Sequence, residues 1–218
     1  MTAIIYGTVM GVIAFISIVT SLIISKYVLK DDYSEKELKL DIPVESMIEL
    51  EGNVSDFLEK NNMVPGVPIY EIAKKLNIER GEIVKNQKNQ AYLSKPDSNG
   101  KMIVTFTDGL TQEEMTFAFA HECAHQVNHD SVPIGRPTGH GKSRREQNAD
   151  YTAAALLMPI ENVYNYLVES DYKNASTRKK VKVIKALCKR YRVSDIIAIR
   201  RIREVYAVKE SFGISNDN

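Results

Sequence analysis

The segment His121-Glu122-Cys123-Ala124-His125 constrains this chain more than any other, because it forms an H-E-x-x-H pattern. On a helix, residues i and i+4 lie on one face about one turn apart, so both imidazoles can bind one metal ion. Glu122 is turned around the helix from His121, which places its carboxylate beside the metal, where it can accept and donate protons. The pattern therefore requires a helix here and predicts a zinc (Zn2+) site, one ion per chain, with Glu122 as the catalytic residue.

A second acidic segment, Glu146 to Asp150, begins 21 residues after His125. A catalytic zinc ion has three protein ligands and keeps its fourth position open. We expect Glu146 to be the third metal ligand beside His121 and His125. Asp150 lies four residues further along the same helix face, where it can accept the free ring N–H of a ligating histidine. Direct ligation by Asp150, with Glu146 only capping its helix, remains the alternative.

Three other residues near the motif, His129, His140 and Tyr151, are polar and could take part in the site. His129 follows His121 by eight residues, or about 12 Å along a helix, so it cannot share one tetrahedral ion with both motif histidines. His140 lies in a loop rich in proline and glycine between the two segments. His140 and Tyr151 are the two candidates for a donor that stabilises the oxyanion of the reaction. For His140 the competing interpretation is a plain connecting loop.

The remaining pattern predicts an α+β fold: a mostly helical, minimal zincin-like domain with a small antiparallel sheet. Capping patterns mark the starts of both metal-bearing helices, Thr111 with Glu114 and Ser143 with Glu146. Residues 101–106 form the clearest strand. Its stretch 102–106 is either an edge to which an extended peptide could add beside the zinc or a central strand without a free edge. Strands are expected at 82–84, 90–93 and 101–106, and further helices after Pro43 and at 69–76, 160–168, 176–191 and 194–205.

The N-terminal segment has a different composition from the rest. Residues 2–25 contain no charged side chain and would span about 36 Å as a helix, enough to cross a bilayer. The start Met1-Thr2-Ala3 lacks the basic region of a secretory signal, so we expect one transmembrane helix. Lys26 and Lys30 follow this span and no lysine or arginine precedes it, which predicts a single-pass membrane protein whose catalytic domain is cytoplasmic.

A strongly basic stretch lies near the C-terminus. Between Arg178 and Arg203 there are eleven lysines and arginines against one acid, Asp195, although the whole chain carries only +1. Nucleic acid and an anionic membrane surface are possible partners for such a stretch, but solvated basic faces of ordinary helices are the favoured interpretation. The two cysteines, Cys123 and Cys188, have no metal or redox spacing, and Cys123 is expected to be a small core residue.

Three segments make the chain resemble the ImmA/IrrE family of bacterial metallopeptidases. They are residues 117–125, 146–159 and 191–202, and the resemblance covers about Val44 to Val205. It implies a zinc endopeptidase that cleaves a DNA-bound transcriptional repressor, often one encoded nearby on a mobile element or involved in a stress response. Because the best-known members are soluble, the expected anchor is a departure from the family pattern.

Together these observations divide the chain into four parts. We expect a transmembrane anchor at 1–27, a charged linker at 28–43, a zinc metallopeptidase domain at 44–206 and a disordered tail at 207–218. The predicted function is hydrolysis of a peptide bond in a protein substrate. The alternative is a membrane-tethered regulator that binds DNA or protein without hydrolysing it, using the basic helices.

Overall fold

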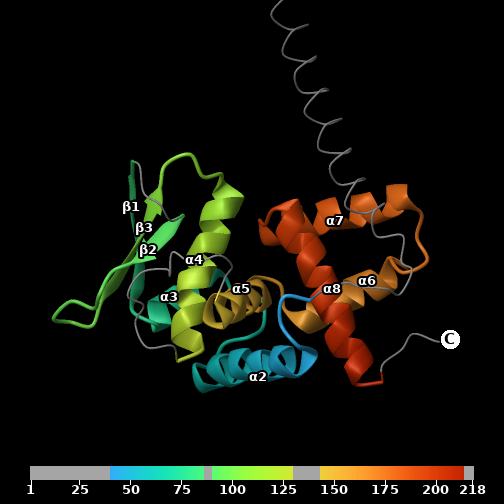
Figure 1. Ribbon diagram of the computed structural model, residues 1–218, viewed down its shortest axis with the longest axis horizontal. Coiled ribbons are helices and arrows are strands. Elements are labelled where there is room, and N and C mark those ends of the chain that lie inside the picture. The colour runs from blue at the N-terminus through green and yellow to red at the C-terminus, as the bar shows by residue number, and fades with distance from the viewer. Residues whose placement is uncertain (1–39, 86–89, 130–142, 214–218) are drawn as a thin grey trace, which may run out of the picture.

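The computed structural model describes residues 40–85, 90–129 and 143–213, which form helices around a small sheet (Figure 1). The elements follow the chain in an order close to the one predicted. They are α2 (Val44–Lys60), α3 (Ile69–Lys75), β1 (Ile78–Val84), β2 (Ala91–Leu93), β3 (Met102–Thr107), α4 (Gln112–Val127), α5 (Arg144–Leu157), α6 (Ile160–Glu169), α7 (Thr177–Tyr191) and α8 (Asp195–Ser211). The mostly helical α+β class is therefore confirmed.

Helix boundaries follow the local signals in the sequence. Pro43 and Pro159 occupy the N-cap positions of α2 and α6, where their missing N–H costs no helical hydrogen bond. Helix α4 begins at the predicted capping box: the Thr111 side chain accepts from the Glu114 backbone, and Glu114 accepts from the Thr111 backbone. Helix α8 extends past its expected end at Val205 because Val208 is buried in the core, which corrects the expected start of the tail at residue 207.

The sheet is mixed, and the prediction of an antiparallel sheet is wrong. Its order is β1-β3-β2, with β3 parallel to β1 and antiparallel to β2. Strands β1 and β3 run the same way, β2 runs the opposite way, and β3 lies between the other two. Of the two interpretations of residues 102–106, the central strand without a free edge is therefore the one that holds. Alternating apolar residues show which face of a strand is buried, but they carry no information on strand order.

Gly81 permits a close approach between β1 and β3. A Cβ atom at this position would lie 2.5 Å from Ile103 Cγ2 and 3.1 Å from the carbonyl oxygen of Val104. The register between the two strands slips between Arg80 and Ile83, on either side of this glycine. A side chain at residue 81 would therefore separate the strands where they are already irregular.

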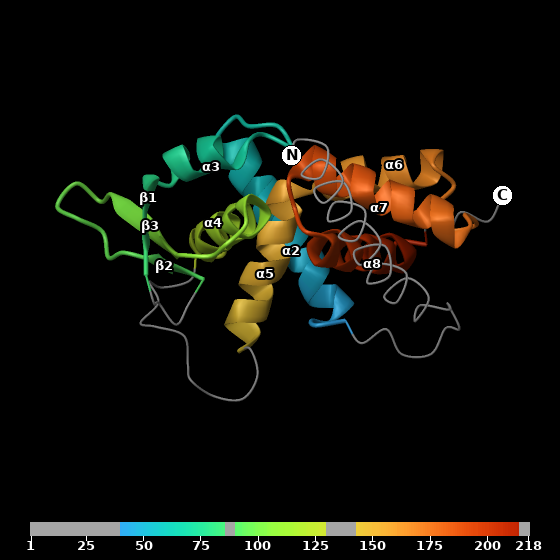
Figure 2. The same ribbon diagram turned by 90° about the horizontal axis from the view of Figure 1, so that it is seen from above.

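The domain has two lobes joined through the middle of the molecule. In Figures 1 and 2 the sheet and α3 lie on one side, α6, α7 and α8 on the other, and α4, α5 and α2 between them. Alternate residues of β3, namely Met102, Val104 and Phe106, share a hydrophobic cluster with Phe119 and Cys123 of α4. The sheet thus packs against α4 through this cluster. Cys123 is a buried core residue, as its position in the sequence predicted.

Helix α5 is enclosed by other helices. It packs against α4, α2 and α8, and residues 149 to 156 are all buried. Three consecutive alanines, Ala153 to Ala155, are each at most 1% exposed. Since neighbouring residues point about 100° apart around a helix, burial of all three means that α5 is covered on every side. The helix that carries Glu146 is therefore held by the core of the domain.

The predicted membrane anchor, residues 1–27, and all of the predicted linker (28–43) except residues 40–43 lie outside the described residues. Within the described ranges, no helix is long and apolar enough to cross a bilayer.

Candidate metal centre

Helix α4 presents the two histidines of the H-E-x-x-H motif on its face toward α5. The His121 and His125 rings lie edge to face with centroids 4.8 Å apart, and the residues are only 4% and 2% exposed. This is the one-turn separation that the spacing predicted. Glu122 lies between them in sequence and is also buried, at 8% exposed.

Helix α5 brings Glu146 to the same point. The Ser143 side chain accepts from the Glu146 backbone N–H and caps the helix, while the Glu146 side chain turns toward the histidines. One of its oxygens lies 3.3 Å from His121 Nε2 and the other 3.6 Å from His125 Nε2. The capping pattern in the sequence is thus only half used, because Ser143 caps the helix while the Glu146 carboxylate faces the two histidines.

These three residues fit a zinc ion. One ligand atom from each of His121, His125 and Glu146 can be chosen so that all lie within 4.8 Å of one another. Donors bound about 2.0–2.2 Å from a tetrahedral ion are themselves about 3.3–3.6 Å apart, close to the two nitrogen–oxygen separations of 3.3 Å and 3.6 Å found here. Two imidazole nitrogens and one carboxylate oxygen also form a ligand set that catalytic zinc sites use. His129, exposed beyond the end of α4, is not part of this group.

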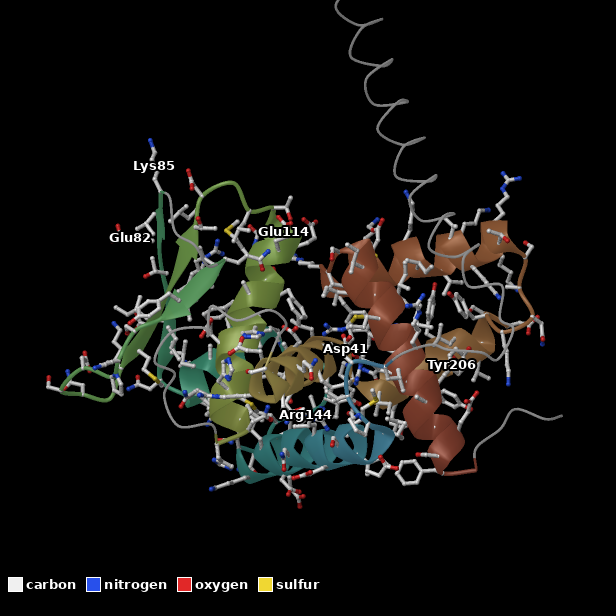
Figure 3. All side chains as sticks on the ribbon, viewed as in Figure 1. Asp41, Glu82, Lys85, Glu114, Arg144 and Tyr206 are labelled. Carbon is white, nitrogen blue, oxygen red and sulfur yellow. The ribbon has the colours of Figure 1, made fainter. Side chains whose placement is uncertain are left out.

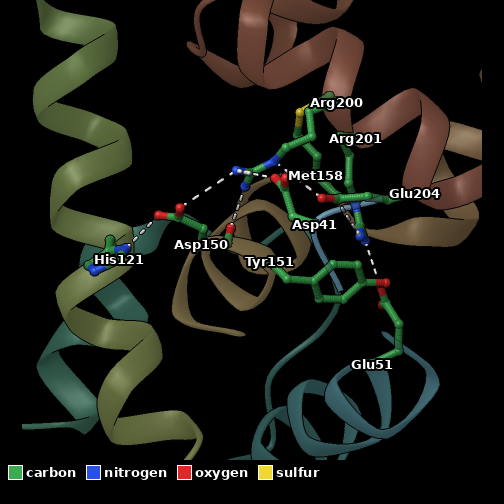
Figure 4. A network of polar contacts seen from close by, with 9 residues as sticks. All are labelled: Asp41, Glu51, His121, Asp150, Tyr151, Met158, Arg200, Arg201 and Glu204. Atoms are coloured by element: carbon green, nitrogen blue, oxygen red, sulfur yellow. Dashed lines mark hydrogen bonds and ion pairs between the residues drawn. The ribbon is translucent and has the colours of Figure 1, made fainter. Parts of the chain in front are cut away.

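Asp150 occupies the supporting position that the sequence predicted. Its Oδ1 lies 2.8 Å from His121 Nδ1, on the side of the ring opposite Nε2 (Figure 4). A proton on Nδ1 leaves the Nε2 lone pair directed at the cluster. Burial alone would lower the pKa of His121, but the hydrogen bonds to Asp150 and Glu146 and the charges of Asp150 and Glu122 together raise that pKa to about 9. The site therefore attracts positive charge strongly.

The two candidate oxyanion donors have different outcomes. Tyr151 is not brought to the cluster: its hydroxyl donates to Glu51 Oε1 at 2.8 Å, and its ring lies under the guanidinium of Arg201. Figure 4 shows the ring pointing away from His121. Burial is the main cause that raises the pKa of Tyr151. Tyr151 is five residues after Glu146, and helical rotation carries it to another face of α5. His140 lies outside the described residues.

A buried ionic network next to the metal centre was not anticipated from the sequence. Arg201 on α8 is fully buried and donates to Glu51 Oε1 at 2.7 Å and to the Met158 carbonyl oxygen at 2.9 Å. Arg200 contacts Asp150, as described below. The sequence does contain a sign of this network. Arg201 is three residues after Ala198 and four before Val205, so it lies within the apolar stripe of α8. A charge at a core position of a helix requires buried partners.

The basic stretch between residues 178 and 203 therefore does not form one surface. Helix α7 exposes a series of cations, whereas Arg200 and Arg201 of α8 point into the domain and pair with acids. The exposed cations of α7 are Arg178, Lys179, Lys182, Lys185, Lys189 and Arg190. The net charge of the stretch in sequence thus overstates the charge of any single face.

Comparison with known proteins assigns this domain to a family. No curated protein sequence matches the chain. The family model of the IrrE N-terminal-like domain, Peptidase_M78, matches residues 73–203, which is more than half of the chain and includes α4 to α7 and the metal cluster. The matched range contains His121, Glu122, His125 and Glu146. The chain therefore belongs to the Peptidase_M78 family and carries its metallopeptidase domain, with a buried His-His-Glu cluster at the H-E-x-x-H motif.

Proposed function

We propose that this protein is a zinc-dependent endopeptidase that hydrolyses a peptide bond in a protein substrate. The observation that carries the proposal is the convergence of His121, His125 and Glu146 in one buried cluster, with Glu122 beside it. The charge of Glu122 is among the causes that raise the pKa of His121, so the two side chains interact.

The residues divide the chemistry among themselves. A bound zinc ion supplies Lewis acidity, which makes water acidic enough to lose a proton near neutral pH and polarises a carbonyl oxygen. Glu122 accepts the proton from the attacking water and returns it to the amine that leaves. Asp150 holds His121 in the orientation that directs Nε2 toward the cluster. The apolar surroundings from α4, α5 and the sheet strengthen each of these interactions by excluding water.

The outer strand β2 suits an extended substrate better than β3 does. Strand β2 packs against α4 and lies at one side of the described sheet, whereas β3 is paired on both sides. An extended peptide adds to such a strand through main-chain hydrogen bonds. By the resemblance to ImmA/IrrE proteins, the substrate is a transcriptional repressor.

The proposal includes a membrane location. Its support is the uncharged run at residues 2–25, followed by Lys26 and Lys30. The full chain should sediment with membranes and resist extraction at high pH, and a variant without residues 1–27 should be released. Equal release of both chains would contradict the membrane assignment without touching the chemistry.

Metal content and cleavage in matched variants test the enzymatic proposal. Wild-type protein should hold about one zinc per chain, Glu122→Gln should keep the zinc but lose cleavage, and His125→Ala should lose both. His129→Ala is the control, because it removes a nearby histidine that lies outside the cluster. New protein N termini in cells expressing wild type, compared with Glu122→Gln, would identify the substrate. Full cleavage by Glu122→Gln would overturn the role of this glutamate.

A further inference from the structure

Arg200 connects the metal centre to the last helix of the domain. Its side chain is 22% exposed, and its guanidinium donates to the Asp150 carbonyl oxygen at 2.8 Å. The same guanidinium faces Asp150 Oδ2 at 3.7 Å, while Oδ1 of that carboxylate accepts from His121. Figure 4 shows His121, Asp150 and Arg200 in a continuous line from α4 through α5 to α8. The carboxylate that orients the histidine is thus itself held from its other side.

Arg200 contacts both metal-bearing helices, each at a residue four positions from a member of the metal cluster. On α5 it holds Asp150, which is four residues after Glu146. On α4 its guanidinium lies over the ring of Phe117, 5.7 Å from the centroid, and Phe117 is four residues before His121. Four residues are about one helical turn, so each contact is one turn from a cluster residue. One side chain therefore contacts both α4 and α5 next to the metal site.

Neighbouring charges explain why Arg200 is held in this position. Glu204, one turn along α8, has Oε1 3.2 Å from Arg200 Nε. Asp41 Oδ2 lies 4.0 Å from Arg200 Nη1. Figure 3 shows Asp41 near the middle of the molecule between α5 and α8. The Asp41 side chain is 62% exposed, so its contribution is weak. The hydrogen bond to the Asp150 carbonyl oxygen and the ion pair with Glu204 are the closer contacts of the guanidinium.

Arg201, the next residue, differs in what it contacts. It is buried against Glu51, Glu204 and the Met158 carbonyl oxygen. None of these residues belongs to the metal cluster or is bonded to its histidines in the described structure. Glu204 faces both arginines, but of the two only Arg200 contacts Asp150.

We propose that Arg200 is a positioning residue for the metal centre: it acts through Asp150 to hold His121 and, with it, the metal. This inference rests on the proposed zinc-dependent function. Direct carboxylate partners of ligating histidines typically contribute about 10- to 100-fold to metal affinity. Arg200 acts one contact further away, so its loss should weaken zinc binding by roughly tenfold.

The first test measures zinc dissociation constants of the full-length chain by competition with a chromophoric chelator. Arg200→Gln should bind zinc about tenfold more weakly than wild type, and Asp150→Asn more weakly still. If Arg200 acts through Asp150, adding Arg200→Gln to Asp150→Asn should change the constant by less than about twofold. Arg200→Lys should recover only part of the affinity, because an ammonium cannot reach the carbonyl and the carboxylate together as the planar guanidinium does. Asp41→Asn is the control and should stay within about twofold of wild type.

A second measurement does not depend on zinc. The Nδ1–H proton of His121 in the metal-free protein should give a downfield NMR signal through its hydrogen bond to Asp150, among only four histidines in the chain. The signal should be lost in Asp150→Asn and shifted or broadened in Arg200→Gln. An unchanged signal and an unchanged zinc constant in Arg200→Gln, or losses that multiply in the double variant, would overturn the inference. Failure of wild type to bind zinc, with the signal behaving as expected, would instead overturn the proposed function.

Discussion

Replacing the buried arginine of α8 is the strictest test of how the two lobes are joined. Arg201→Met keeps a long unbranched side chain but removes the charge and every donor. Glu51 would lose an ion pair of 2.7 Å, Glu204 would lose its neighbour at 3.7 Å, and the Met158 carbonyl oxygen would lose a hydrogen bond of 2.9 Å. Buried acceptors would thus be left without the cation that compensates them.

The size of the loss follows from the contacts that remain. Removing one partner of a buried ion pair typically costs about 3–5 kcal/mol. Glu51 keeps the Tyr151 hydroxyl at 2.8 Å, and Glu204 keeps Arg200 at 3.2 Å, so the two losses should not add in full. We expect a decrease in the free energy of unfolding of about 4 kcal/mol, or a melting temperature lower by roughly 8–16 °C.

Urea and thermal denaturation of the metal-free protein, followed by far-ultraviolet circular dichroism, would measure this loss without a contribution from bound metal. The triple variant Arg201→Met, Glu51→Gln, Glu204→Gln also removes the stranded charges and should recover at least half of the stability. A single variant within about 1 kcal/mol of wild type, or a triple variant less stable than the single one, would refute the reasoning.

Three further predictions concern the core and the surface. Gly52→Ala on the exposed side of α2 should raise the free energy of unfolding by about 1 kcal/mol in urea titrations, whereas Gly81→Ala should lower it by about 1–3 kcal/mol; equal effects would contradict the close approach at β1. Burial raises the pKa of Glu204 to about 7 even though Arg200 and Arg201 oppose the shift, so its contribution to stability is present below the unfolded pKa of 4.5 and is lost as pH rises through 7. Wild type should therefore lose on the order of 1–3 kcal/mol relative to Glu204→Gln between pH 5 and pH 8, and parallel pH profiles would disprove this. Burial raises the pKa of Cys188 to about 12 and that of Cys123 further, so a thiol reagent at pH 7 should modify native protein slowly and Cys188 first; prior modification of Cys123 would show that α4 opens.

The metal cluster could be predicted from the sequence because both of its halves are local helical patterns. His121 and His125 share a face by their spacing alone, and Glu146 and Asp150 do so in the same way. Joining the halves needed only the rule that a catalytic zinc has three protein ligands. The structure places Asp150 as this pattern predicted, with its carboxylate hydrogen-bonded to Nδ1 of His121.

Features that depend on contacts distant in sequence could not be predicted in this way. The order of the strands depends on whether β1 pairs with β2 or with β3. The alternation of apolar residues along each strand would be the same in both arrangements. The partner of Tyr151 is Glu51, 100 residues earlier, and the Arg201 pair with Glu51 spans 150 residues. A sequence pattern can show that Arg201 is misplaced in an apolar stripe, but only the packed structure shows which acid meets it.

The enclosure of α5 has a consequence for how this protein can change over evolutionary time. Ala153, Ala154 and Ala155 take no part in the chemistry, yet each faces a neighbouring element at close range. A larger residue at any of them would displace the helix that carries Glu146, and overpacking of this kind typically costs about 1–3 kcal/mol. A deep mutational scan that reports on zinc retention should therefore find these alanines replaceable only by glycine or serine. The number of sequences able to form this centre is limited as much by the room around one helix as by the residues that hold the metal.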